Sequence, residues 1–147
     1  MSERSRRATL EEDGWTLVSA EERHASHPQS FHIPPRDERE SLSPGDAAKL
    51  LFDIETREDG RVMDRGVDRM WVIVRRRGSG DYIGVLDNDP GTAMGLKLHE
   101  GDTMGLKLHE GDTIAFGPEH VADIDRPSRE YIVEKFGAGF FEDSGAD

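Results

Sequence analysis

Two identical clusters of ionisable side chains are the first feature of the sequence that could carry chemistry. The ten-residue string MGLKLHEGDT occupies residues 94–103 and again, without a mismatch, residues 104–113. Each copy contains one histidine and two acids: His99, Glu100 and Asp102, then His109, Glu110 and Asp112. Imidazole and carboxylate groups are ligands for zinc or manganese. Because an adjacent His and Glu would face opposite sides of a strand and would be solvated in a turn, we interpret both clusters as solvated turns.

Three further histidines lie in a proline-interrupted segment: His24, His27 and His32. Their spacing has no cysteine beside it and falls on no clear helical pattern, which is typical of surface histidines. The chain contains no cysteine, no Gly-x-Ser-x-Gly nucleophile elbow, no GxGxxG and no Walker sequence. We therefore assign no catalytic residue, no metal and no cofactor, and we keep a small hydrolase with a His/Asp constellation as an alternative.

The charge balance restricts the class of partner. Lys plus Arg number 19 against 31 Asp plus Glu, a formal net charge of −12. This field repels a phosphate backbone and attracts a basic protein, so we expect a protein partner and no nucleic acid. The Arg75-Arg76-Arg77 triplet beside a Gly-Ser-Gly turn is interpreted as a solvated strand end. Without a signal peptide or an apolar run of about 18 residues, the sequence predicts a soluble cytoplasmic protein with no membrane partner.

The elements that would position these side chains belong to one domain. A chain of 147 residues is long enough to bury a core without disulfides or metal. Polar sequence at both ends predicts a disordered N-terminal tail at residues 1–12 and a flexible C-terminal tail at 137–147, around a single globular domain at 13–136.

Residues 47–55 fit either a helix or a strand. A helix would place Ala47, Leu50, Leu51 and Ile54 on one face, and a strand would align Ala48, Leu50, Phe52 and Ile54. The preceding Leu42-Ser-Pro-Gly45-Asp46 has the same Leu-x-x-Gly-Asp form as Leu108-His-Glu-Gly111-Asp112. Glycine supplies the positive φ of a tight turn and aspartate can bond its own backbone. We therefore favour turns that lead into strands.

A hairpin is the clearest element of the sequence. Residues 70–75 and 82–87 are β-rich, and Asn88-Asp89-Pro90-Gly91 ends the second run. Gly84 inside this run predicts a bulge or a close approach by another segment. Further expected elements are a strand at 113–116, a turn of helix from Pro118 to Ile124, and a final strand or short helix at 128–136. Together they predict an α+β fold, with a mainly antiparallel, partly closed, barrel-like sheet and a few short helices.

The segments AAKLLFDIE, DRMWVIVRR, YIGVLDNDP, GLKLHEGDTIAF and EHVADI resemble the bacterial YegJ-like domain of unknown function over roughly residues 47–125. The positions on that pattern are Lys49, Trp71, Gly84, Leu86, Asn88, Pro90, Gly111 and Asp112. The closing Asp-Trp of the pattern is absent, because Asp123 is followed by Ile124. The resemblance supports a strand at 47–55 and implies no enzymatic machinery.

These observations favour a non-catalytic binding or regulatory module that presents a sheet edge, or the turn at 87–91, to another protein. The candidate binding residues are Trp71, Asn88, Asp89 and Pro90. An acidic immunity protein that neutralises a basic toxin is the alternative of a different class. For the tandem string, a recent duplication or a cloning artefact is the simplest origin. We expect residues 104–113 to supply the native turn and 94–103 to form a surface excursion.

Overall fold

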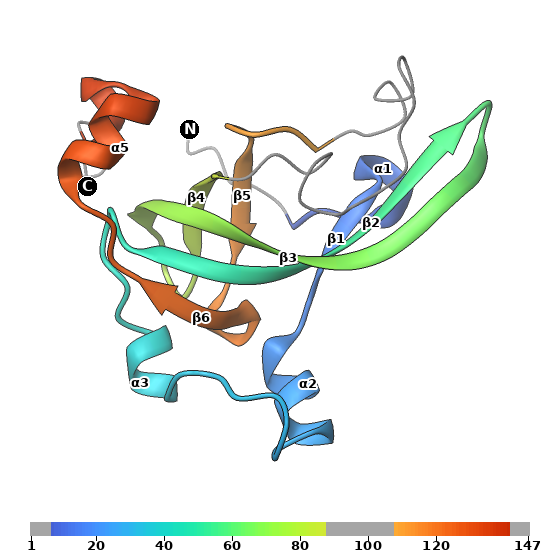
Figure 1. The fold of residues 1–147 in the computed structure, drawn as a ribbon, viewed down its shortest axis with the longest axis horizontal. Coiled ribbons are helices and arrows are strands. Elements are labelled where there is room, and N and C mark those ends of the chain that lie inside the picture. Colours follow the sequence, from blue (N-terminus) through green and yellow to red (C-terminus); the bar gives the residue numbers. More distant parts are fainter. Residues whose placement is uncertain (1–6, 88–107, 142–147) are drawn as a thin grey trace.

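The computed structural model describes residues 7–87 and 108–141, which form an antiparallel sheet with short helices around it (Figure 1). Five of its six strands are hydrogen-bonded in the order β1-β2-β3-β4-β5, and the sixth, β6, pairs with β2 on the edge that β1 also uses. The sheet curls into a partly closed half-barrel. The predicted α+β fold with a mainly antiparallel, barrel-like sheet is confirmed.

The strands are β1 Trp15–Val18, β2 Ala47–Glu58, β3 Arg61–Arg77, β4 Tyr82–Leu86, β5 Thr113–Phe116 and β6 Val121–Asp125. The helices are α1 Leu10–Asp13, α2 Ala20–Ser26, α3 Arg36–Arg39 and α5 Arg129–Phe136, with the 3-10 turns η2 Pro118–His120 and η3 Ala138–Phe141. Among the described residues, no helix is long and apolar enough to cross a membrane.

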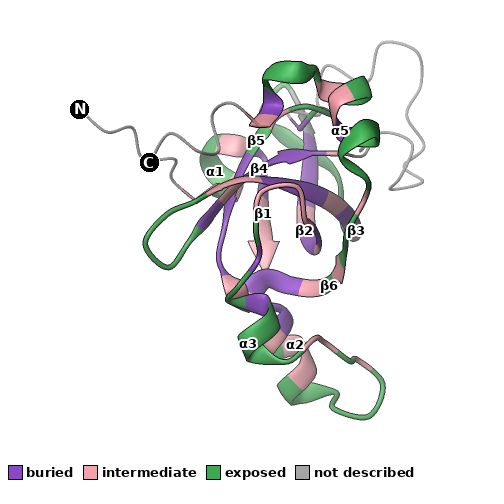
Figure 2. Cartoon of the chain, turned by 90° about the vertical axis from the view of Figure 1, so that its left-hand side faces the viewer, coloured by how far each residue is buried: buried purple, intermediate pink, exposed green. Residues whose placement is uncertain are grey.

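Strand β2 separates two apolar cores, one on each of its faces. Its residues in the larger core, inside the curl of the sheet, are Ala48, Leu50, Phe52 and Ile54. On the other face, Ala47 packs with Ile73 and Val85 beneath α5 and η3. Figure 2 shows this burial along the centre of the sheet. Full burial of such an aliphatic or aromatic side chain stabilises the fold by about 1.5–3 kcal/mol. Because successive residues of 47–55 face the two cores alternately, this segment is a strand rather than a helix.

The two Leu-x-x-Gly-Asp segments fold into the same turn. The glycine has a positive φ in both, 97° at Gly45 and 94° at Gly111, a conformation that side chains disfavour. The aspartate N–H donates to the carbonyl oxygen three residues earlier, at 2.9 Å to Ser43 and 3.0 Å to His109. The aspartate carboxylate accepts from the N–H of that same residue, at 2.9 Å in both turns. The shared sequence therefore produces a shared local structure.

Both turns are attached to the β3–β4 hairpin. The N–H of Gly45 donates to the carbonyl oxygen of Val74 at 2.8 Å, and the N–H of Gly111 donates to that of Leu86 at 2.9 Å. Val74 and Leu86 each donate back to the carbonyl oxygen of the aspartate in their turn, at 2.8 and 2.9 Å. Residues 108–113, the part of the second decapeptide copy that the structure describes, thus supply the turn that leads into β5. Residues 94–103 lie outside the described residues.

Gly84 allows β3 and β4 to approach closely. A Cβ at this position would lie 2.5 Å from Cγ1 of Val72 and 2.6 Å from the carbonyl oxygen of Ile73. The register between the two strands also shifts after Val74. The predicted close approach is confirmed, and the bulge lies on the partner strand.

One predicted helix is mostly a strand. Between Pro118 and Ile124, only Pro118–His120 is helical, and Val121–Asp125 pairs with β2 as β6. Hydrogen bonding to an open edge of β2 therefore outweighs the helix-start signal of the proline. The segment at 128–136, for which strand and helix were both open, forms α5 with the Ser128 hydroxyl accepting from the Tyr131 N–H at 3.1 Å.

The described part of the chain continues past residues 13–136 at both ends. In the segment predicted as an N-terminal tail, Arg7 pairs with Asp81 at 2.7 Å, and the Thr9 side chain caps α1. At the other end, Phe140 is 1% exposed and belongs to the smaller core. Helix capping at one end and one buried aromatic ring at the other stabilise these two segments, although both are polar in composition.

The tips of β2 and β3 form a two-stranded ribbon that extends away from the rest of the sheet (Figure 1). Pairing with β1 ends at Ile54 and pairing with β4 begins only at Val72. Three apolar side chains on this ribbon are exposed: Val62, Met63 and Val67. The ribbon therefore contributes little to either core.

Candidate functional site

Trp71 lies on the sheet face that α5 covers. Its indole ring is partly buried against the smaller core. Lys49, opposite Trp71 in the β2–β3 register, places Nζ 4.9 Å from the centroid of the ring. The structure thus positions Trp71, the described member of the predicted binding residues, at a surface rather than in the larger core.

A pocket of about 370 Å³ opens beside this ring, and we call it the Trp71 pocket. It lies between α5, the end of β6 and the centre of β3. Its lining residues are Ala47, Trp71, Ile73, Asp87, Asp125, Pro127, Ser128 and Tyr131. Aromatic rings and carboxylates converge on an apolar floor, which is the usual composition of a site that binds a small group and fixes its orientation.

One wall of the Trp71 pocket is a hydrogen-bonded cluster around Asp87. Its carboxylate, 8% exposed, accepts from the Tyr131 hydroxyl at 2.8 Å and from Nζ of Lys135. Lys135 also pairs with Glu110 at 2.8 Å. Burial lowers the pKa of Lys135, but hydrogen bonds to Asp87 and Glu110 outweigh it and raise that pKa above its ordinary value. Burial and the Asp87 hydrogen bond raise the pKa of Tyr131. Both groups keep their protons, so the cluster is a fixed wall rather than an acid–base pair.

The other wall belongs to an edge strand. Within the described part of the chain, β2 is the one strand that pairs with β6. Asp123 and Asp125 on β6 are exposed, and neither forms an ion pair with another described residue. An unpaired strand edge with two such carboxylates can accept main-chain hydrogen bonds and attract cations.

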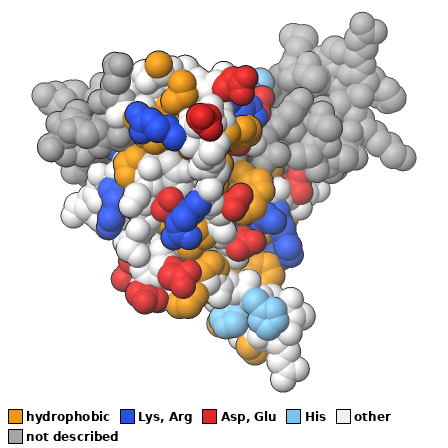
Figure 3. Space-filling model, turned by 60° about the vertical axis from the view of Figure 1, so that its left-hand side comes forward, with side chains coloured by type: hydrophobic (Ala, Val, Ile, Leu, Met, Phe, Trp, Pro, Cys, Tyr) orange, Lys and Arg blue, Asp and Glu red, His pale blue; other side chains and the backbone are white. Residues whose placement is uncertain are grey.

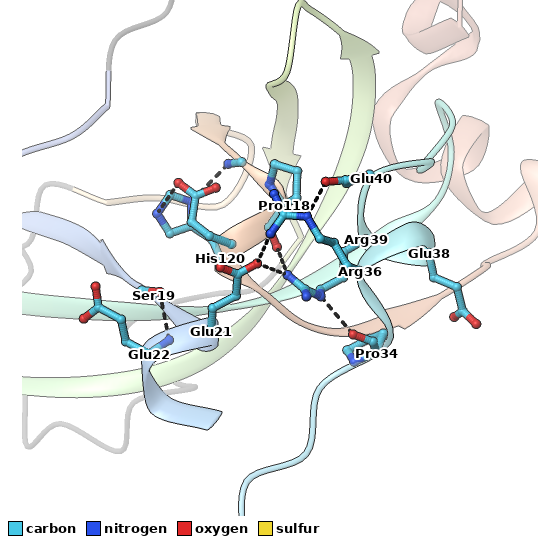
Figure 4. A network of polar contacts seen from close by, with 12 residues as sticks. Ser19, Glu21, Glu22, Pro34, Arg36, Glu38, Arg39, Glu40, Pro118 and His120 are labelled. Atoms are coloured by element: carbon cyan, nitrogen blue, oxygen red, sulfur yellow. Dashed lines mark hydrogen bonds and ion pairs between the residues drawn. The ribbon is translucent and has the colours of Figure 1, made fainter. Parts of the chain in front are cut away.

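A second, larger hollow of about 600 Å³ lies at the far end of the sheet, around α2, α3 and η2, and its floor is a network of ion pairs (Figure 4). Arg39 is 6% exposed and donates to Glu21 at 2.6 Å, to the carbonyl oxygen of Pro118 at 3.0 Å and to that of Pro34 at 2.8 Å. Arg36 bridges Glu21 and Glu40. Because these groups already bond one another, the network joins α2, α3 and η2 and has a structural role.

His120 closes the same region. It is 8% exposed, and its Nδ1 accepts the Gly117 N–H at 3.0 Å. Burial lowers the pKa of His120, although the carboxylate of Glu119, 3.8 Å from Nε2, opposes that shift. The neutral imidazole therefore holds the backbone of η2 in place.

The other predicted chemical residues do not converge. Asn88, Asp89 and Pro90, and the first cluster of His99, Glu100 and Asp102, lie outside the described residues. The second cluster forms the predicted exposed turn, with the His109 side chain 66% exposed. Nδ1 of His24 bonds the carbonyl oxygen of Phe31 at 2.6 Å, and His27 and His32 are exposed. Within residues 7–87 and 108–141, no three His, Asp or Glu side chains are grouped as a metal site requires.

Sequence reasoning located one part of the Trp71 pocket and missed the rest. The Asp87 N–H donates to the carbonyl oxygen of Trp71 at 2.9 Å, so the predicted 87–91 turn begins beside the predicted tryptophan. Tyr131 and Asp125 were not identified, because tertiary packing of α5 and pairing of β6 bring them there. The alternation of Asp123 and Asp125 was the available signal of an edge strand.

Comparison with known proteins returned no matching family, curated protein or solved structure.

Proposed function

We propose that this chain is a non-catalytic binding module that holds a cationic side chain of a partner protein in the Trp71 pocket. The observation that carries the proposal is the position of an uncompensated carboxylate, Asp125, beside Trp71 and Tyr131 at the end of an open strand edge. The YegJ-like resemblance, with its lack of enzymatic machinery, is part of the same proposal.

The pocket chemistry favours a cation. Asp87 is already neutralised by Lys135, whereas Asp125 has no ion pair among the described residues. A lysine or arginine between two aromatic rings gains from their negative faces as well as from the carboxylate. The net charge of −12 adds a long-range attraction for a basic partner.

The edge of β6 supplies a means of holding the partner's backbone. An extended peptide can add to β6 through main-chain hydrogen bonds, with its alternate side chains on the face of Asp123 and Asp125. Carboxylates on an edge strand also discourage two copies of this acidic chain from pairing there. The edge thus selects an extended peptide of opposite charge.

Titration of the ¹⁵N-labelled protein with two extended peptides tests the proposal. One peptide alternates Lys with Thr, and the other has Glu in place of Lys. We expect the lysine peptide to shift the Trp71 indole resonance and the amides of 121–125, and the glutamate peptide to leave them unchanged. Trp71→Ala and Asp125→Asn should weaken binding, by about 1–2 kcal/mol for the loss of a cation contact.

Glu11→Gln is the matched control, because Glu11 is an exposed carboxylate on α1, far from the pocket. This variant should bind as the parent does. Equal binding of both peptides, or lysine-peptide shifts that do not involve Trp71 and β6, would contradict the proposal.

A further inference from the structure

A third pocket lies beyond Lys49, on the side of that residue away from α5, and we call it the Lys49 pocket. It has a volume of about 460 Å³ and lies between the α2–α3 connection and strands β2, β3 and β6. Its lining residues are Ser30, Phe31, His32, Ile33, Pro34, Glu38, Lys49, Arg69, Ala122, Asp123, Ile124 and Arg126. Three of these side chains are basic: Lys49, Arg69 and Arg126.

Two of the cations are stacked on aromatic rings instead of paired with carboxylates. Nζ of Lys49 lies 4.9 Å from the Trp71 centroid, and the guanidinium carbon of Arg69 lies 5.4 Å from that of Phe31. Neither forms an ion pair with any residue that the structure describes. In a chain with 31 acidic and 19 basic side chains, carboxylates are in excess, and two cations of this pocket nevertheless form no ion pair with a described residue.

Stacking orients these cations without using their hydrogen-bond donors. An aromatic face attracts the positive charge of a guanidinium, and this attraction does not require its five N–H donors to bond the ring. The ammonium group of a lysine likewise has three N–H donors, and contact with the face of a ring leaves these donors available. Phe31 and Trp71 therefore hold Arg69 and Lys49 in place with donors available to an acceptor.

The strand register places both cations on one face. Lys49 is opposite Trp71, and Arg69 is opposite Leu51, so the two cationic residues are diagonal neighbours on β2 and β3. Diagonal neighbours of an antiparallel pair are about 7–8 Å apart. Across this distance, two long side chains can both contact one oxyanion. A guanidinium matches the two oxygens of a carboxylate or phosphate.

We infer that the Lys49 pocket binds a single oxyanion group, a phosphate monoester or a carboxylate, on a molecule with an apolar body. Lys49 and Arg69 hold the oxygens, and the apolar lining, Phe31, Ile33, Pro34 and Ile124, contacts the body. Glu38 and Asp123 also line the pocket, and Asp123 is opposite Lys49 in the β2–β6 register. These two carboxylates disfavour polyanions, in agreement with the charge of the whole chain.

Three probes of one shape test the inference: phenyl phosphate, benzoate and uncharged benzamide. Each is titrated into the ¹⁵N-labelled protein, and the indole N–H resonance of Trp71 is followed in the same spectra, because an anion that engages Lys49 changes the charge above the indole ring. We expect phenyl phosphate or benzoate to shift the amides of 30–34 and 122–124, and benzamide to bind at least tenfold more weakly. The stronger anion identifies phosphate or carboxylate as the preferred group.

Arg69→Gln and Lys49→Gln should each weaken anion binding at least tenfold. Glutamine keeps part of the side-chain stem over the ring, and thermal unfolding verifies that each variant is folded. Arg61→Gln is the matched control, because it removes the same charge from the same strand at an exposed position on the ribbon. Binding that is equal for benzamide and the anions, or that Arg61→Gln weakens as much as Arg69→Gln, would overturn the inference. The lining of this pocket contains neither Trp71 nor Asp125, although Asp123 belongs to both sites. Arg69→Gln leaves Trp71 and Asp125 in place, so loss of anion binding with retained lysine-peptide binding in this variant distinguishes the two proposals.

Discussion

At the scale of single residues, His120 shows how burial turns a common side chain into a pH-dependent structural element. Burial lowers its pKa below the ordinary value of 6.5, so the folded protein holds the neutral imidazole. The unfolded chain takes up a proton near pH 6.5, and stability that is present above this pH is lost as the pH falls toward the lower folded pKa.

We predict that the free energy of unfolding decreases between about pH 7 and 5, and that His120→Asn flattens this dependence while its amide oxygen still accepts the Gly117 N–H. His120→Ala removes that acceptor and should cost about 1–3 kcal/mol at neutral pH. Urea unfolding at several pH values measures both effects. A pH slope that persists in His120→Asn but disappears in His27→Asn, a change at an exposed histidine, would refute the assignment to His120.

The close approach of β3 and β4 at Gly84 leaves no room for a side chain. Gly84→Ala would bring Cβ to 2.6 Å from the Ile73 carbonyl oxygen, which is backbone and cannot rotate away. We expect a loss of about 1–3 kcal/mol, measured by urea unfolding. Gly139→Ala is the control, because its Cβ would meet no atom within 4 Å and its φ is not in the left-handed range. Loss of less than about 0.5 kcal/mol in Gly84→Ala would show that the strands can separate without cost.

At the scale of elements, local signals predicted the strands and turns that the chain specifies by itself. The glycine and aspartate of each Leu-x-x-Gly-Asp turn close their own hydrogen bonds, so sequence alone indicated them. Strand β6 was mistaken for helix because its five residues follow a proline, and its strand conformation depends on pairing with β2. The site was found only in part for the same reason, since Tyr131 reaches Asp87 across 44 residues of chain.

The tandem decapeptide provides an internal comparison for one element. Leu108 is 1% exposed in the larger core, and Leu98 is its counterpart in the first copy. Leu108→Ala should cost about 2–5 kcal/mol, as expected for a truncated buried leucine. If 94–103 is an added surface excursion, Leu98→Ala should change stability by less than about 0.5 kcal/mol.

Deletion of residues 94–103 tests the same interpretation without a core substitution. The deletion should leave the fold intact and the stability equal or slightly higher, because loop closure entropy grows slowly with length. Chemical unfolding measures the change. A loss of more than about 2 kcal/mol, beyond the range of surface changes, would show that both copies are packed.

Over the whole molecule, charged side chains are numerous, and both signs occur side by side on the surface. On the side shown in Figure 3, acidic and basic side chains are interspersed with apolar ones instead of forming patches of one sign. The charge of −12 therefore acts mainly at long range, and individual sites such as the Lys49 pocket keep a local sign of their own.

This distinction predicts different salt dependences for the rate and the lifetime of a complex. With the lysine peptide of the proposed function, the association rate should fall as salt reduces the Debye length from about 10 Å at 0.1 M to about 3 Å at 1 M. The dissociation rate, set by contacts in the Trp71 pocket, should change less. Stopped-flow measurements over this range separate the two. A salt-independent association rate would exclude long-range steering.

The two identical turns on the β3–β4 hairpin have a geometric consequence. Ile73 pairs with Val85, Ala47 pairs with Ile73, and Thr113 pairs with Val85. A half-turn about an axis through the Ile73–Val85 pair therefore exchanges β3 with β4, β2 with β5, and one Gly-Asp turn with the other. The centre of this barrel has pseudo-twofold symmetry within a single chain. Its asymmetric parts, β6, α5 and the α2–α3 connection, complete the Trp71 and Lys49 pockets, whose remaining lining comes from β2, β3 and the residue after β4.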